Sequence, residues 1–115
     1  MSLPKKVLFV CNQNRYRSRT AEDLCRHSPT IEAKSAGIDT DAVVPLSADH
    51  IIWADTICVF ESRQLNRIRK KYKGILSDKR LLCLDIPDEF EYMDPVLVNE
   101  LKGKLSILLG ADPKP

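Results

Sequence analysis

The sequence contains no hydrophobic run that approaches the roughly 20 residues needed to cross a membrane. The apolar stretch nearest the N-terminus, residues 7–10, is also too short for the core of a signal peptide. We therefore expect a cytoplasmic protein with no membrane partner. Aromatic residues make up only 6% of the 115 residues, so aliphatic side chains must fill most of the core.

The cysteines lack the spacing of a metal site. No two of the four are separated as in a C-x-x-C pair, which is typical of zinc ligands. Cys25, Cys58 and Cys83 lie in apolar stretches, where a reduced thiol packs as a small hydrophobic side chain. We therefore expect neither a zinc site nor a disulfide framework. Cys11 differs from these three, because it ends an apolar run and precedes a polar segment.

Neither positive nor negative charge is in large excess. Charged residues make up 30% of the sequence and the formal net charge is +2, a balance that argues against a general nucleic-acid-binding protein. The most basic stretch, residues 63–73, fits a solvated helix face best, with contact to an acidic phosphoprotein as the alternative.

Short apolar runs alternate with segments of helical period along the whole chain. This alternation predicts a single α/β domain, residues 1–115, with a doubly wound four-stranded parallel sheet between helices in three layers. In such folds ligands bind outside the carboxyl ends of the strands, and Cys11 falls at the end of the first strand. The predicted strands are 6–10, 31–36, 56–60 and 81–84, and the predicted helices are 18–27, 47–54, 62–72 and a last one that opens at Asp94-Pro95.

The segment between the first strand and the first helix has the composition of a phosphate-binding loop with a nucleophile. Cys11 is followed six residues later by Arg17 and then by Ser18. A strand that turns into a helix directs successive N–H groups at one point, and the helix N-terminus adds positive potential that favours a thiolate. We expect Arg17 to grip two phosphoryl oxygens and Ser18 to donate to the sulfur. The predicted cradle comprises Asn12, Gln13, Asn14, Arg15, Tyr16, Arg17 and Ser18.

These residues resemble the opening motif of the low-molecular-weight protein tyrosine phosphatase family. Residues 7–11, Asn14, Arg17-Ser18 and Ala21-Glu22 match its first strand, loop and helix, and weaker matches follow in order at residues 35–37 and 54–61. The resemblance implies a four-stranded parallel sheet and a cysteinyl-phosphate mechanism that needs no metal or other cofactor.

The chain departs from the family at several positions, so it resembles a short and atypical member. Gln13 and Tyr16 stand where the family has a glycine and a second cysteine, Arg15 is unusual, and Arg19 replaces a proline. A glutamine tolerates a positive φ poorly, so the sequence raises the question of backbone strain at Gln13. The segment from residue 37 to 54 is also shorter than is usual in the family.

The resemblance also implies an aspartic acid, in an Asp-Pro pair after the last strand, that protonates the leaving group. Asp94-Pro95 is such a pair, but it is expected to serve as a helix N-cap and first turn instead. Asp85 ends the last predicted strand and is our first choice, with Asp88 close behind it and Asp94 third. Phe90 or Tyr92 in the same loop is a candidate wall for an aromatic substrate, with core packing as the alternative.

The function expected from these residues is hydrolysis of phosphate monoesters, with a phosphorylated protein or a small phosphate ester as the partner. Phosphate and other oxyanions are then expected to inhibit. Three alternatives remain. They are a phosphopeptide- or anion-binding module without turnover, an arsenate reductase and a phosphoryl carrier on the same fold. Arsenate reduction needs resolving cysteines on a mobile segment, whereas Cys58 and Cys83 are predicted to lie on buried strands.

Overall fold

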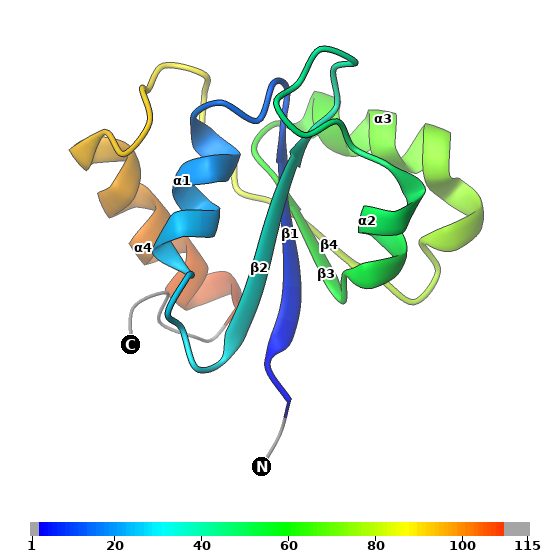
Figure 1. Ribbon diagram of the computed structural model, residues 1–115, viewed down its shortest axis with the longest axis horizontal. Coiled ribbons are helices and arrows are strands. Elements are labelled where there is room, and N and C mark those ends of the chain that lie inside the picture. Colours follow the sequence, from blue (N-terminus) through cyan, green and yellow to red (C-terminus); the bar gives the residue numbers. More distant parts are fainter. Residues whose placement is uncertain (1–2, 110–115) are drawn as a thin grey trace.

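The computed structural model describes residues 3–109, with side chains up to residue 107. Its strands form one sheet in the order β2-β1-β3-β4, and every neighbouring pair is parallel (Figure 1). The predicted four-stranded parallel sheet is therefore confirmed. The strands are β1 (Lys5–Cys11), β2 (Ile31–Gly37), β3 (Thr56–Val59) and β4 (Arg80–Cys83).

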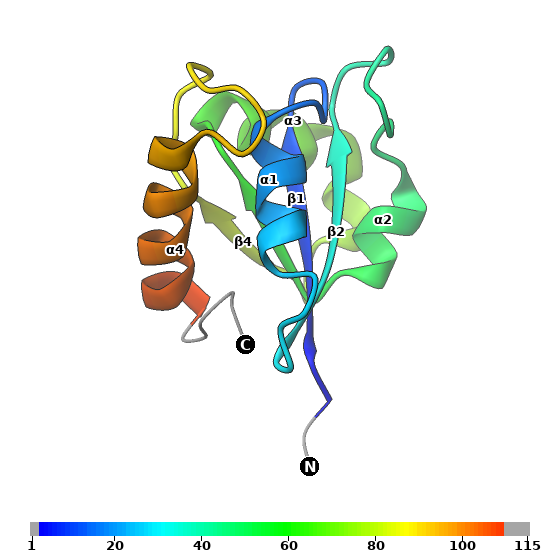
Figure 2. The same ribbon diagram turned by 60° about the vertical axis from the view of Figure 1, so that its left-hand side comes forward.

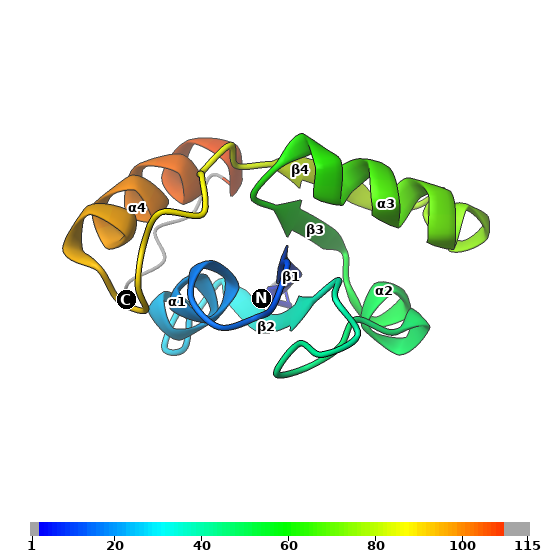
Figure 3. The ribbon, with the colours of Figure 1, turned by 90° about the horizontal axis from the view of Figure 1, so that it is seen from above.

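Helices cover both faces of the sheet, which gives the three layers expected from the sequence. Seen from above, α1 and α4 lie together on one side and α2 and α3 on the other (Figure 3). The helices are α1 (Arg17–Leu24), α2 (Ala48–Trp53), α3 (Ser62–Tyr72) and α4 (Pro95–Leu109), and the 3-10 turn η1 (Lys73–Ile75) follows α3.

The core consists of two apolar clusters separated by the sheet, and β1 contributes to both. Val7 and Phe9 face α1 and α4, whereas Leu8 and Val10 face α2 and α3. Successive side chains of a strand point to opposite faces, so a strand buried on both sides must be continuously apolar. This requirement explains the unbroken run that ends at Cys11.

The helix boundaries differ from the prediction mainly at the first helix, which ends at Leu24 instead of His27. The Arg26 N–H donates to the Asp23 carbonyl at 3.2 Å, so the chain tightens into a turn there. Pro29 disfavours helical geometry at the residue before it, which also limits continuation. In α4, Leu97, Leu101 and Leu105 are buried as the apolar stripe predicts, and the side chain of Leu108 lies outside the described residues.

The topology brings three irregular segments to the carboxyl end of the sheet. The loop after β1, the segment after β2 and the segment after β4 all lie at this end of the molecule (Figure 2). In the part of the chain from residue 3 to 109, no helix is long and apolar enough to span a membrane.

We predict that Leu101→Ala lowers the free energy of unfolding by about 2–5 kcal/mol, because it leaves a cavity between α4 and the sheet. Leu101 has no exposed surface, whereas Ile107 on the same helix is 82% exposed. Ile107→Ala is therefore the matched control and should change stability by less than about 0.5 kcal/mol. Urea unfolding followed by circular dichroism measures both, and equal effects would contradict the packing described for α4.

Candidate active site

The loop from Cys11 to Tyr16 is clamped from outside by the segment after β2. The carbonyls of Cys11, Asn12 and Gln13 accept hydrogen bonds of 2.9–3.0 Å, in that order from the N–H groups of Ile38, Asp39 and Val43. No peptide bond among the described residues is cis, and in a trans peptide the N–H points opposite to the carbonyl. The N–H groups of Asn12, Gln13 and Asn14 therefore face the inside of the loop.

The Cys11 sulfur lies at the base of this loop with two hydrogen-bond partners. The Asn14 N–H donates to Sγ at 3.3 Å, and the Ser18 Oγ lies 3.0 Å from Sγ. The Asn14 side-chain amide donates to that same Oγ at 2.7 Å. The Ser18 hydroxyl accepts from Asn14 and keeps its own proton, which it can donate to the sulfur when Cys11 is a thiolate. Both contacts stabilise a thiolate.

Arg17 begins α1 and is almost fully buried, although it is charged. Its Nη1 donates to the Glu61 carboxylate and to the Ile86 carbonyl, both at 2.9 Å. The guanidinium carbon also lies 5.6 Å from the centre of the Phe60 ring, within cation–π distance. These partners fix the plane of the guanidinium while Arg17 lines the cavity above Cys11.

A buried amide at Gln64 connects the loop to α3, and sequence reasoning missed it. Its Oε1 accepts from the N–H groups of Phe60 and Glu61, at 2.8 and 3.0 Å. Its Nε2 donates to Asn12 Oδ1 at 3.0 Å and to Glu61 Oε2 at 3.2 Å. The spacing Glu61-x-x-Gln64 is a capping signal that the sequence does contain.

The cavity above Cys11 has a volume of about 170 Å³. Of the predicted cradle, Asn14 and Ser18 do not line it and instead contact the sulfur. Asp39 lines it and was not among the predicted residues. The lining residues are Cys11, Asn12, Gln13, Arg15, Tyr16, Arg17, Asp39 and Asp88.

The three candidate acids occupy different places. The Asp88 carboxylate lies 3.8 Å from Arg17 Nε and lines the cavity. Asp85 is exposed and does not line it. Asp94 Oδ1 accepts from the Val96 N–H at 2.8 Å, which is the N-cap role expected of it. The geometry therefore favours Asp88 over Asp85.

The unusual loop residues do not strain the backbone as the sequence suggested. Asn14, not Gln13, has the positive φ, at 57°, and asparagine tolerates this left-handed region well. The aromatic residue at the cavity is Tyr16, which is 43% exposed. Phe90 instead packs on the core, and the Tyr92 hydroxyl donates to the Asp23 carboxylate.

The remaining cysteines lie away from this cavity. Burial raises the pKa of Cys25 and of Cys58 to about 12. Cys83 is half-buried on β4. Within residues 3–109, no three His, Cys, Asp or Glu side chains are grouped so that they could hold a metal ion.

Gly37 is required by the close approach of the loop. A Cβ at this position would lie 2.6 Å from the Asn12 carbonyl oxygen and 2.9 Å from the Asn14 nitrogen. We therefore predict that Gly37→Ala destabilises the protein by roughly 1–3 kcal/mol and weakens phosphate binding. Urea unfolding and calorimetric titration with phosphate measure the two effects.

Gly74→Ala is the control for Gly37→Ala, because a Cβ at Gly74 meets no atom within 4 Å. This variant should bind phosphate as the wild type does and be at least as stable. Unchanged stability and phosphate affinity in Gly37→Ala would show that the loop is not held as described.

We predict that iodoacetamide at neutral pH modifies Cys11 while Cys25 and Cys58 remain unmodified in the folded protein. Alkylation requires a thiolate. The sulfur of Cys11 accepts from the Asn14 N–H and contacts the Ser18 hydroxyl, whereas burial raises the pKa of Cys25 and of Cys58 to about 12. Peptide mapping by mass spectrometry measures each site, phosphate should slow the reaction, and Cys11→Ser should abolish it. Modification of Cys25 or Cys58 at an equal rate would contradict the assignment.

Comparison with known proteins finds similar structures but no similar sequence family. No family model and no curated protein sequence matches the chain. Solved structures do match. The YwlE arginine phosphatase from Geobacillus stearothermophilus is 22% identical, with 90% of this chain and 88% of that chain covered and a TM-score of 0.69.

Two further structures bear on the alternatives. The tyrosine phosphatase Wzb from Escherichia coli K30, solved with phosphate, is 17% identical, covering 87% of this chain and 92% of that one at a TM-score of 0.71. A thioredoxin-dependent arsenate reductase from Corynebacterium glutamicum is 20% identical, with 95% of this chain and 62% of that chain covered and a TM-score of 0.66. The resemblance inferred from the sequence is thus confirmed for the architecture: this chain has the fold of the low molecular weight protein tyrosine phosphatases.

Proposed function

We propose that the protein is a cysteine-dependent phosphatase that hydrolyses phosphate monoesters through a cysteinyl-phosphate intermediate. The observation that carries the proposal is the position of Cys11 Sγ. It lies below inward-facing N–H groups, beside a buried Arg17, and in contact with Ser18 and Asn14. This arrangement supplies a nucleophile and a cradle for three phosphoryl oxygens.

In the first step the Cys11 thiolate attacks phosphorus, and the bond from phosphorus to the leaving oxygen breaks. The loop N–H groups and Arg17 balance the charge on the equatorial oxygens. The Arg17 Nη1 is occupied by Glu61 and Ile86, so Nε and Nη2 are assigned to the phosphate. Asp88 gives its proton to the leaving oxygen, because it is the acid that lies by Nε at the cavity.

In the second step water attacks phosphorus, the phosphorus–sulfur bond breaks, and Asp88 takes a proton from the water. Inorganic phosphate and the Cys11 thiolate are formed. The Ser18 hydroxyl, 3.0 Å from Sγ, stabilises the thiolate as it leaves. The substrate is a phosphorylated protein or a small phosphate ester, and the exposed Tyr16 ring at the cavity suits an aromatic ester such as phosphotyrosine.

The other chemistries considered from the sequence have less support. Arsenate reduction, the activity named for one structural neighbour, needs a thiol that can reach Cys11. Cys25 and Cys58 are buried and no cysteine but Cys11 lines the cavity. A phosphoryl carrier must protect its phosphocysteine from water, whereas Asp88 beside this cavity favours hydrolysis. A binding module without turnover is an outcome of the following test.

We predict that Cys11→Ser lowers kcat for p-nitrophenyl phosphate by at least roughly a thousandfold, since it removes the nucleophile. Asp88→Asn should lower kcat for phosphotyrosine by up to about a hundredfold. Its kcat for p-nitrophenyl phosphate should fall much less. Tyrosinate, with a pKa of about 10, needs a proton to leave, whereas the less basic nitrophenolate does not.

Asp85→Asn is the matched control and should retain wild-type rates with both substrates. A larger loss in Asp85→Asn than in Asp88→Asn would contradict the assignment of the acid. Calorimetric binding of phosphate by a wild-type protein that hydrolyses neither substrate would contradict the phosphatase and support a binding module.

A further inference from the structure

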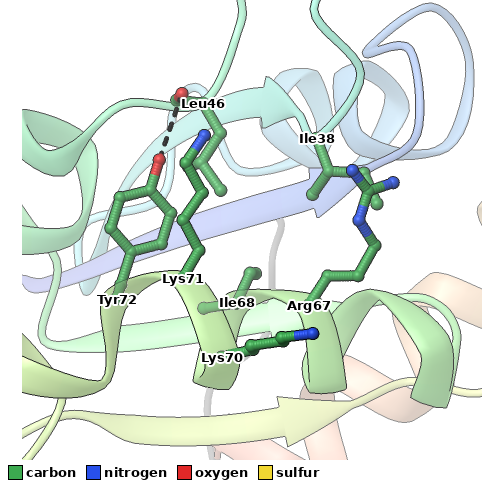
Figure 4. A pocket seen from close by; sticks show the side chains of 7 residues that line it. All are labelled: Ile38, Leu46, Arg67, Ile68, Lys70, Lys71 and Tyr72. Atoms are coloured by element: carbon green, nitrogen blue, oxygen red, sulfur yellow. Dashed lines mark hydrogen bonds between the residues drawn. The ribbon is translucent and has the colours of Figure 1, made fainter.

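A second cavity that combines apolar and basic side chains lies beside α3 and not above Cys11. Its volume is about 410 Å³, and Figure 4 shows the side chains that line it. Ile38, Leu46, Ile68 and Tyr72 supply its apolar surface, and the basic side chains at it are Arg67, Lys70 and Lys71. The Tyr72 hydroxyl donates to the Leu46 carbonyl at 3.4 Å, which ties α3 to the segment after β2. We call this cavity the α3 groove.

The α3 groove adjoins the cavity above Cys11. Ile38 lines the groove and its neighbour Asp39 lines the catalytic cavity. The Ile38 N–H donates to the Cys11 carbonyl at 2.9 Å. Arg67 Nη1, from the groove, lies 3.8 Å from Asp39 Oδ1. A ligand whose phosphate lies over Cys11 can therefore extend across Ile38 and Asp39 into the groove.

The charge of the groove is positive and largely unbalanced. None of the described residues that line it carries a carboxylate. Among residues 3–109, Asp39 is the acidic partner of Arg67, and no salt bridge involves Lys70 or Lys71. Lys71 Nζ lies 5.6 Å from the centre of the Tyr72 ring. The ammonium groups of Lys70 and Lys71, which form no salt bridge within residues 3–109, therefore lie beside an apolar surface.

We propose that the α3 groove selects phosphoprotein substrates that carry acidic side chains next to an apolar residue, close to the phosphorylated residue. This proposal rests on the proposed phosphatase function. Asp39 repels an acidic group at the boundary of the two cavities, so the acidic side chains lie farther along, at Lys70 and Lys71. An apolar surface between cations suits a peptide better than a nucleic acid, whose phosphates need basic groups along a continuous path.

The test compares phosphotyrosine peptides that carry two Glu residues before or after the phosphotyrosine with the same peptides carrying Gln. Because two exposed ion pairs can form, the wild type should have a roughly fivefold higher kcat/KM for at least one Glu peptide than for the matching Gln peptide. This preference should fall as salt is raised, because the pairs are exposed. The double variant Lys70→Gln/Lys71→Gln should lose the preference and keep the wild-type rate with p-nitrophenyl phosphate.

The matched control is Arg69→Gln/Lys73→Gln, which removes the same charge from exposed positions that do not line the groove. It should keep the preference. Equal kcat/KM for Glu and Gln peptides in the wild type would overturn the proposal, and so would an equal loss of preference in both double variants.

Failure of the groove and failure of the catalytic proposal give different results. Hydrolysis of p-nitrophenyl phosphate without any peptide preference overturns the groove alone. If the wild type hydrolyses nothing, fluorescence anisotropy with the same labelled phosphopeptides replaces kcat/KM. Tighter binding of a Glu peptide that is lost in Lys70→Gln/Lys71→Gln then supports the groove, and equal binding of Glu and Gln peptides overturns it.

Discussion

The buried charge of Arg17 is the constraint on which the rest of the site depends. Its side chain is 2% exposed, and a cation so far from water requires partners. Glu61, after β3, and the Ile86 carbonyl, after β4, both engage Nη1. One guanidinium therefore joins α1 to the carboxyl ends of two strands. Breaking a buried pair costs about 3–5 kcal/mol, and the low end applies here because Glu61 is 31% exposed.

The two carboxylates near Arg17 have different consequences. Glu61 contacts Arg17 Nη1 and does not line the cavity, whereas Asp88 lines it and is 59% exposed. Glu61 therefore fixes the orientation of Arg17 without meeting an incoming anion. Asp88 lies on an irregular segment and contacts Arg17 only at 3.8 Å, so a phosphate can displace it at small cost. The loop N–H groups and the start of α1 supply the remaining positive potential.

The strands and the loop were predictable from the sequence because they depend on neighbours in the chain. A continuous apolar run, a helix start and the spacing of Cys11, Arg17 and Ser18 are all local signals. Gln64 was missed because its contact with Asn12 joins residues 52 positions apart. For a similar reason, the sequence did not indicate that Asp88, and not Asp85, lines the cavity above Cys11. Asp85 has a positive φ of 57°, and no apolar period encodes the path that follows it.

The segment after β2 connects the two cavities, because it clamps the loop with N–H groups and forms a wall of the α3 groove. Its two roles place different demands on sequence. The clamp uses the backbone and the close approach at Gly37, so it tolerates little change. The groove uses side chains of α3, and neither Lys70 nor Lys71 lines the cavity above Cys11. Under the proposed function, substitutions on α3 would therefore change substrate preference while the cradle around Cys11 stays intact.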